Sequence, residues 1–311
     1  MKFCVKIVRV FCFSAGILFL AICKSEPSSA ITYRLNGGRF GDNLLSYSRA
    51  KWLSYTYDIP LFYFPFPYSD QLMLSEYEEK YNSDMRNTFD TVVWLPEGRS
   101  PLYRNNNTLY ITNWNVKVSI DWNNPDFVNH IKEMIAPRYP LETVTIPEGY
   151  ISVAVHARKG GTFAADTPRE KARCPLRFVP NHFFVSQLER IARMYKGKKL
   201  YVYIFTDHPN PAKIARKLKD RLQNDEIVFD YRQENNSHKQ NVLEDFFSMM
   251  KFDCLIRPGS HFSRFVERLG NNHVVIYPCS VTKRNGETHI SKVAIKQRTE
   301  HGWKVIREKL V

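Results

Sequence analysis

The segment from Ile151 to Phe163, ISVAVHARKGGTF, decides the fold of this 311-residue chain. It opens with an apolar, largely β-branched run over residues 151–155, which is typical of a strand buried on both faces of a sheet. The run stops abruptly at the sequence HARKGG, residues 156–161. A buried parallel strand that ends in basic residues and glycines marks the carboxyl edge of an open α/β sheet, where such sheets bind ligands.

The residues at the end of this strand have the chemistry of an anion site. Alternation along the strand places His156 and Arg158 on the same side, with Lys159 opposite them or in the loop. Arginine offers a planar fork of donors to a phosphate, and the paired glycines allow the backbone to approach a ligand closely. Taken alone, the segment fits a solvated turn equally well, so the interpretation depends on the rest of the chain.

The composition indicates a folded protein with anionic partners. The hydrophobic fraction of 43% supplies ample core for one large or two medium domains. The formal net charge of +14 suggests nucleic acid, acidic lipid or a phosphorylated small molecule as partner, although positive charge spread along a chain, as here, is more often a solvated surface. No zinc finger, RNP-type motif or other nucleic-acid-binding module is present, so nucleic acid is not expected. No CxxC motif or His/Cys cluster predicts a metal site.

Residues 1–30 are predicted to be a signal peptide or an N-terminal membrane anchor. A basic start is followed by a short apolar run at residues 10–23 and then by small residues. This is the pattern of a secretory signal, and the run is short for a membrane span. We expect either export or an uncleaved type II anchor.

The remaining sequence predicts an α/β protein with two domains. Strands and helices alternate over residues 151–277, which is typical of a parallel sheet with right-handed crossovers, and residues 30–140 give a rougher version of this pattern. Prolines place the boundary within residues 136–150, so the domains are expected at 31–140 and 141–311. Strands are expected near residue 31 and at 59–64, 91–95, 108–112, 151–155, 200–205, 227–229, 253–257 and 274–277. Helices are expected at 43–57, 69–81, 126–135, 181–196, 210–222 and 241–252, and from the loop at 258–264 to residue 269.

Other loops are expected to share the crevice with His156 and Arg158. The glycine-rich loop at residues 38–43 precedes a helix, where backbone N–H groups can bind an anion, although a structural turn fits equally well. Later strands lead into Thr206-Asp207 and into the sequence SHFSR at 260–264, and the carboxyl ends of parallel strands share one edge. Asp245 suits guanine, because a carboxylate accepts the N1–H and the exocyclic amine side by side. Singly, each residue has a structural explanation as a cap or a surface charge.

Three blocks, in order, resemble those of the GDP-fucose fucosyltransferases, the α1,2-, α1,6- and protein O-fucosyltransferase superfamily. GRFGDN at residues 38–43 is similar to the family's GRFGNQ or GRLGNQ loop. VHARKG at 155–160 resembles its HVRRGD or HVRRTD block, and the segment from Asp245 through Asp253 to SHFSR at 260–264 resembles its D…D…STFS segment. The strand that ends in Asp207-His208-Pro209 also resembles the family's F-S/T-D-D-P.

The resemblance implies a fold and an activity. It implies two Rossmann-like domains that face one another across a cleft, the GT-B type, with GDP-fucose held mainly by the C-terminal domain. It implies inverting transfer of fucose to a glycan or protein hydroxyl, of α1,2 or α1,6 type, without a metal or other cofactor. A GDP-sugar donor favours an uncleaved type II anchor in a Golgi-like lumen over full secretion.

The resemblance also implies roles for individual residues. Arg158 grips the β-phosphate and stabilises the departing GDP, and His156 lies beside it as the second catalytic candidate. The donor-binding residues that it implies are Gly38, Arg39, Phe40, Asn43, Lys159, Asp207, Asp245, Ser260, Phe262, Ser263 and Arg264. Asp42 and Asp166 are the candidate bases, and solvent is the alternative acceptor of the proton.

The chain departs from the family pattern in ways that leave other functions open. Lys159 stands where the family has a second arginine, Gly161 stands where it has an aspartate, and Asp42-Asn43 replaces its Asn-Gln pair. The alternative is a catalytically inactive relative that binds a nucleotide or a glycan. A third possibility is a transferase with another anionic nucleotide donor, such as a sulfotransferase, against which the lack of a P-loop-like segment counts.

Overall fold

The computed structural model describes residues 29–95, 107–160, 167–300 and 302–310. Contacts divide the chain into two units, of which the first comprises the chain up to Gly37 together with Ser46–Ala136, and the second comprises Gly38–Leu45 and Pro137–Val311. The glycine-rich loop therefore groups with the second unit. None of the helices described is long and apolar enough to cross a membrane. Residues 1–28 of the predicted targeting segment, Gly161 and Asp166 lie outside the described residues.

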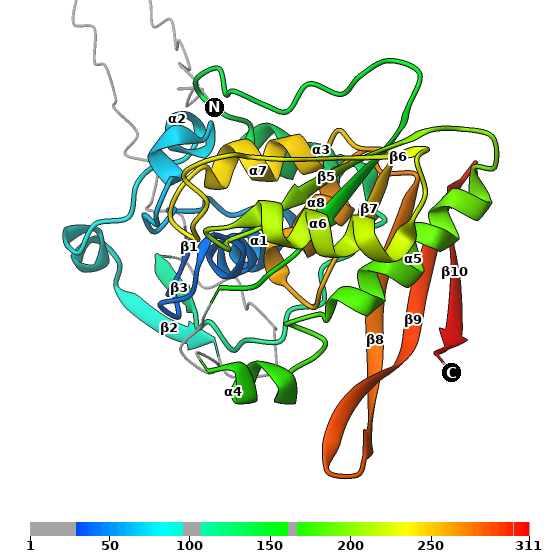
Figure 1. Ribbon diagram of the computed structural model, residues 1–311. Coiled ribbons are helices and arrows are strands. Elements are labelled where there is room, and N and C mark those ends of the chain that lie inside the picture. The colour runs from blue at the N-terminus through cyan, green and yellow to red at the C-terminus, as the bar shows by residue number, and fades with distance from the viewer. Residues whose placement is uncertain (1–28, 96–106, 161–166, 301, 311) are drawn as a thin grey trace, which may run out of the picture. The chain divides into compact units, whose positions relative to one another are not determined.

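The second unit is built on a seven-stranded sheet (Figure 1). From β4, parallel pairing continues through β5 to β6 on one side and through β7 to β8 on the other. The strand order thus reverses between β4 and β7, and ligands of open α/β sheets bind beside the carboxyl ends at such a point. The strands are β4 (Ile151–His156), β5 (Leu200–Phe205), β6 (Ile227–Tyr231), β7 (Cys254–Ile256), β8 (Val274–Arg284), β9 (Glu287–Thr299) and β10 (Gly302–Lys309).

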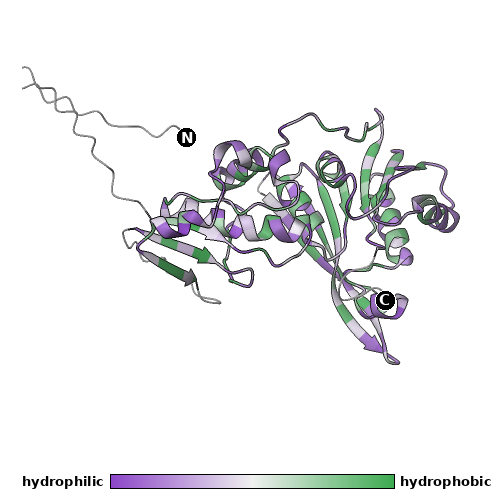
Figure 2. Cartoon of the chain, turned by 90° about the vertical axis from the view of Figure 1, so that its left-hand side faces the viewer, coloured by the Kyte–Doolittle hydropathy of each residue, from purple (hydrophilic) through white to green (hydrophobic). Residues whose placement is uncertain are grey.

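Side chains on the two faces of the parallel strands pack against different helices. Val153 and Val202 form one core with buried residues of α5 (Asn181–Met194) and α6 (Pro211–Leu222). Tyr203 and Phe205, on the opposite face of β5 from Val202, contact Phe252 just after α7 (Val242–Met249). These strands are hydrophobic along their length (Figure 2), as expected for a sheet that is buried on both faces. The remaining helices of this unit are α4 (Pro168–Arg173) and α8 (His261–Leu269).

The C-terminal strands differ from the expectation of a single last strand at residues 274–277. β8 continues to Arg284, turns, and returns as β9, to which β10 adds an antiparallel edge. Asn285 and Gly286 form the turn with φ of +51° and +77°, the conformation that suits a two-residue hairpin. The sheet is therefore mixed, and the prediction of a parallel sheet is correct only for the strands from β6 across to β8. Figure 1 shows the β8–β9 hairpin extending past the parallel strands.

The first unit contains a three-stranded parallel sheet in the order β1-β3-β2. Its elements are β1 (Ala30–Tyr33), β2 (Thr91–Leu95), β3 (Thr108–Thr112), α2 (Leu74–Tyr77), α3 (Pro125–Ile135) and the 3₁₀ helices Ser69–Gln71 and Asp84–Thr88. The helix α1 (Phe40–Tyr57) belongs to this unit from Ser46 onward, and its start groups with the second unit. Residues 59–64 make only isolated bridges at Leu61 and Tyr63, not the expected strand, and proline cannot donate to a ladder. The helix expected at 69–81 is broken into a 3₁₀ turn and α2.

Candidate functional site

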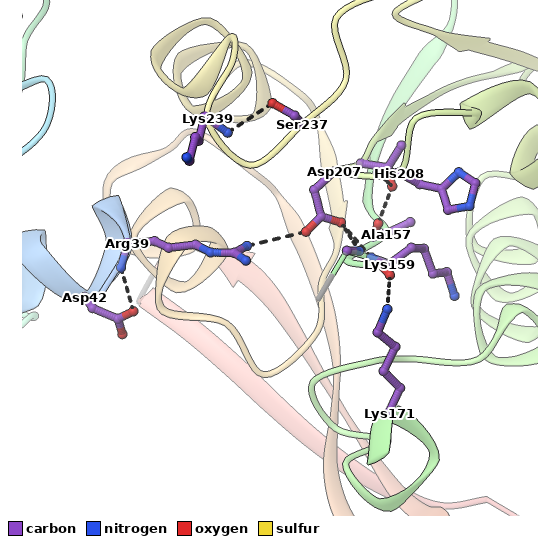
Figure 3. Close-up of polar contacts among 11 residues, drawn as sticks. Arg39, Asp42, Ala157, Lys159, Lys171, Asp207, His208, Ser237 and Lys239 are labelled. Carbon is purple, nitrogen blue, oxygen red and sulfur yellow. Dashed lines mark hydrogen bonds and ion pairs between the residues drawn. The ribbon is translucent and has the colours of Figure 1, made fainter. Parts of the chain in front are cut away.

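The loop after β4 is shaped by a carboxylate from the neighbouring strand. Asp207, just beyond β5, accepts hydrogen bonds from the backbone N–H groups of Lys159 at 2.7 Å and Gly160 at 2.6 Å, both on Oδ1. A Cβ on Gly160 would lie 2.5 Å from Asp207 Oδ2, so this approach requires glycine. Arg39 Nη1 lies 3.5 Å from the same Oδ2 (Figure 3). Asp207, predicted to bind the donor, therefore holds the loop through the backbone.

The two predicted catalytic residues at this loop differ in charge at neutral pH. Burial and the nearby guanidinium of Arg39 lower the pKa of Arg158 to about 10, so Arg158 remains a cation. Burial, with the charges of Arg158 and Arg257, lowers the pKa of His156 to about 4, although Asp207 opposes this shift. His156 is therefore a neutral imidazole that can exchange hydrogen bonds with a ligand without adding charge.

The helix that follows β7 begins beside this loop without a side-chain cap. Ser260 is the N-cap of α8, but its side chain makes no capping hydrogen bond. The first N–H groups of a helix have no acceptor within the helix, and such groups can bind an anion. Ser263, in the first turn, is fully buried.

Four predicted site residues have a buried polar atom with no hydrogen-bond partner among the described residues. These atoms are Asn43 Oδ1, His156 Nδ1, Arg158 Nε and Ser263 Oγ. Buried polar atoms are nearly always paired, so each unpaired one calls for an explanation. A polar ligand at the sheet edge would supply the missing partners.

Aromatic rings connect the starts of α1 and α8 with the end of β4. The Phe262 ring lies 6.2 Å from Phe40, 5.4 Å from Phe246 and 5.6 Å from the His156 ring, between centroids. Phe40 is only 4% exposed, so its ring is a core contact. The close approach extends to the backbone, since a Cβ on Gly41 would lie 2.3 Å from the Phe262 nitrogen. Gly38, directly before this turn, is half-buried.

Three other predicted donor-binding residues are placed differently from this group. Lys159 donates from Nζ to the carbonyl of Val179 at 2.6 Å, and Figure 3 shows its side chain running away from Arg39. Arg264 is exposed. Asp245, in the first turn of α7, is bound by Arg232 at 3.0 Å, and burial raises its pKa to about 6 against the effect of that guanidinium.

The structure adds residues that sequence reasoning did not select. His261, the first residue of α8, bonds through Nδ1 to Asp42 Oδ1 at 2.7 Å. Arg232 joins Asp245 from the loop after β6. His261 stands inside the SHFSR block, so its chemistry was visible, but no sequence signal connects it to a carboxylate 219 positions away.

A cavity of about 560 Å³ lies elsewhere in the second unit, bounded by α4, α5 and the β8–β9 hairpin. None of the predicted site residues is among its described lining residues, which include Phe178, His182 and His289. The unpaired polar atoms, the uncapped start of α8 and the strand reversal all point instead to the edge between β4 and β7, and we take that edge as the candidate site.

Solved structures, but no family model or curated sequence, resemble this chain. No family model and no curated protein sequence matches this chain. Among solved structures, a mutant of Arabidopsis thaliana FUT1 in complex with GDP matches with a TM-score of 0.55 and 12% identity, over 90% of this chain and 74% of that chain. The alpha-1,6-fucosyltransferase NodZ from Bradyrhizobium, co-crystallised with GDP, gives a TM-score of 0.47 and 14% identity, over 81% of this chain and 95% of that chain. Over most of its length, this chain is therefore similar in structure to a fucosyltransferase, which confirms the expected resemblance at the level of the fold.

Proposed function

We propose that this protein is a glycosyltransferase that moves fucose from GDP-fucose to a hydroxyl of a glycan or protein, with inversion at the anomeric carbon. The observation that carries the proposal is the group of four unpaired buried polar atoms on Asn43, His156, Arg158 and Ser263. They belong to residues that the sequence resemblance selects for the donor. The fold likeness to FUT1, which was solved with GDP, supports the same donor class.

The proposed roles follow from the charges at the site. Arg158, a buried cation, stabilises the negative charge that develops on the β-phosphate as GDP departs. Ser263 and the first turn of α8 hold the phosphates. His156, neutral at pH 7, exchanges a hydrogen bond with the donor. Because fixed donors and a guanidinium meet the phosphate charge, the proposed reaction needs no metal, and GDP release from GDP-fucose should be unchanged by EDTA.

The guanine site in this proposal is the pair of Asp245 and Arg232. Arg232 occupies Asp245 Oδ1 at 3.0 Å, so the carboxylate accepts from guanine through its remaining lone pairs. Arg232 also has a buried Nε without a partner among the described residues. We propose that this nitrogen donates to the base or to a bridging water.

Calorimetric titration of the protein with GDP in the absence of metal tests the proposal. Arg158→Ala should weaken GDP binding by about tenfold to a hundredfold, since a buried charge-assisted contact contributes about 1.5–3 kcal/mol. Arg216→Ala is the matched control, because Arg216 is exposed on α6 and should leave binding unchanged. Folded wild-type protein that binds no GDP would contradict the proposal.

The second candidate function is a relative that binds the nucleotide without turning it over. One observation favours it: the Lys159 ammonium donates to the Val179 carbonyl, and its side chain runs away from Arg39 (Figure 3). A slow release of GDP from GDP-fucose without an acceptor would identify an enzyme, whereas GDP binding without release would identify a binding protein. Competition by adenosine phosphates at the same site would instead favour a different nucleotide donor.

We also propose three properties that the sequence resemblance and the N-terminal pattern predict. They are the GT-B arrangement of the two units, an acceptor linkage of α1,2 or α1,6 type, and a type II anchor or signal within residues 1–30. An acceptor screen with linkage analysis tests the proposed linkage. Membrane fractionation of the full chain beside a chain that starts at residue 30 tests the proposed anchor.

A further inference from the structure

Asp42 and His261 form a carboxylate–imidazole pair at the candidate site. Asp42 Oδ1 and His261 Nδ1 are 2.7 Å apart, and each side chain is 38% exposed. The pair is thus open to a reactant, unlike the buried ion pair of Arg257 and Glu267, whose side chains are 4% and 6% exposed. Solvent weakens an exposed pair, so stability alone is a poor explanation for it.

Backbone packing positions this pair. Gly41 and Phe262 are in direct contact, and a Cβ at residue 41 would lie 2.3 Å from the Phe262 nitrogen. Their neighbours Asp42 and His261 consequently meet across the starts of α1 and α8. Phe262 and Ser263, which follow His261, are predicted donor-binding residues, so the imidazole lies next to the donor site.

The charge of Asp42 determines where the imidazole carries its proton. Burial would raise the pKa of Asp42, but the hydrogen bond with His261, the N–H of Arg39 and the charge of Arg158 hold it below its ordinary value. Asp42 is therefore an ionised acceptor, and a hydrogen bond to it requires a proton on Nδ1. A neutral His261 then has its lone pair on Nε2, which is the form that takes a proton from a hydroxyl.

We propose that His261 is the catalytic base and that Asp42 is the residue that positions it, an inference that rests on the proposed function. His261 Nε2 takes the proton of the attacking hydroxyl while the hydroxyl oxygen forms a bond to the anomeric carbon of fucose. The bond from that carbon to the β-phosphate oxygen breaks, and its electron pair leaves with GDP, beside Arg158. Water can replace the acceptor, and the products are then fucose and GDP.

GDP release from GDP-fucose in water, measured together with GDP affinity, tests the catalytic role. His261→Gln keeps the size and polarity of the side chain but removes the base, so kcat for GDP release should fall by about 10²- to 10⁴-fold. Its Kd for GDP should stay within about twofold of the wild-type value. His273→Gln is the matched control: His273 faces Asp253 at 3.8 Å, is 63% exposed, and belongs to the same unit.

The positioning role of Asp42 has its own readout. In wild-type protein, long-range ¹H–¹⁵N spectra should show His261 protonated on Nδ1. In Asp42→Asn, the amide oxygen can keep the hydrogen bond from the Arg39 N–H, which turns the NH₂ group toward Nδ1 and moves the ring proton to Nε2. Release of GDP should then fall as in His261→Gln. If the contact were only structural, Asp42→Asn would change stability and the tautomer but would not slow the release of GDP.

Each outcome decides between the two proposals. If the wild type binds GDP and His261→Gln releases it at the wild-type rate, or if wild-type His261 carries its proton on Nε2, only the present inference fails. A wild type that binds GDP but never releases it from GDP-fucose also overturns this inference, as does a large loss of GDP affinity in His261→Gln. A wild type that binds no GDP overturns the proposed function and the inference together.

Discussion

At the residue scale, Asp207 organises the candidate site although its carboxylate faces the protein. One oxygen accepts two backbone N–H groups of the β4 loop, and the other lies near Arg39. Burial would raise the pKa of Asp207, but the N–H groups of Gly160 and Lys159 and the charge of Arg158 lower it. The ionised carboxylate thus fixes the loop that bears Arg158.

Asp207→Ala should therefore affect stability and binding together. Two backbone N–H groups lose their acceptor, and an unsatisfied buried donor costs about 1–3 kcal/mol. We expect that loss in the free energy of urea unfolding, together with weaker GDP binding because Arg158 is no longer held in place. Asp220→Ala, an exposed change on α6, is the control and should alter neither quantity. Unchanged GDP affinity in Asp207→Ala would show that the loop keeps its form without this carboxylate.

His156 should make the protein sensitive to acid. Its pKa falls from 6.5 to about 4 on folding, so the unfolded chain binds more protons between these values. Stability is therefore lost as the pH falls through this window, by up to about 3 kcal/mol for this residue. Urea unfolding at pH 7, 5.5 and 4 should show a smaller loss for His156→Gln than for wild type, whereas exposed His273→Gln should follow wild type. Equal losses in His156→Gln and wild type would refute this assignment.

At the scale of elements, the contact between the starts of α1 and α8 assembles the site, and Gly41 permits it. Helix propensity alone predicts that Gly41→Ala stabilises α1 by about 1 kcal/mol. The structure predicts the opposite sign, because the new Cβ would lie 2.3 Å from backbone nitrogen, and overpacking costs about 1–3 kcal/mol.

The Gly41→Ala variant should thus lose stability in thermal unfolding and lose the Asp42–His261 contact. Its His261 ¹⁵N spectrum should resemble that of Asp42→Asn. Gly149→Ala is the control: Gly149 has a φ of +80° and no atom within 4 Å of the added Cβ, so it should lose stability through backbone strain alone and keep its GDP affinity. A stabilised Gly41→Ala would mean that the two helix starts do not touch.

Elements differ in how far the sequence predicts them. β4 and β5 are apolar runs that end at glycine or polar residues, and local pattern suffices for both. β9 and β10 were missed because they carry few apolar residues and show no regular alternation, with burial confined to Val293–Ile295. The Asn285-Gly286 turn is a local signal that could have revealed the hairpin. The pairing of Asp42 with His261 is set by tertiary packing, so no local pattern contains it.

At the scale of the whole molecule, buried charges tie the C-terminal strands to the site. Glu267 on α8 accepts hydrogen bonds from Arg257 Nε and from Lys296 Nζ of β9, each at 2.6 Å. The Arg257 guanidinium also lies 4.0 Å from the Tyr277 ring on β8. The added antiparallel strands thus anchor the helix whose first turn carries His261 and Ser263.

Glu267→Gln should be among the most damaging single changes to the fold. The substitution removes the carboxylate with which both Arg257 and Lys296 form ion pairs. Breaking a buried ion pair by removing one partner costs about 3–5 kcal/mol. Glu308→Gln is the control, because the Arg190–Glu308 pair lies at the surface and contributes at most about 1 kcal/mol. The free energies of unfolding of the two variants, measured with urea, should differ by at least about 2 kcal/mol. Because α8 connects this network to the site, saturating GDP should raise the melting temperature of Glu267→Gln less than that of Glu308→Gln. Equal stability of the two variants would mean that the C-terminal strands do not support α8.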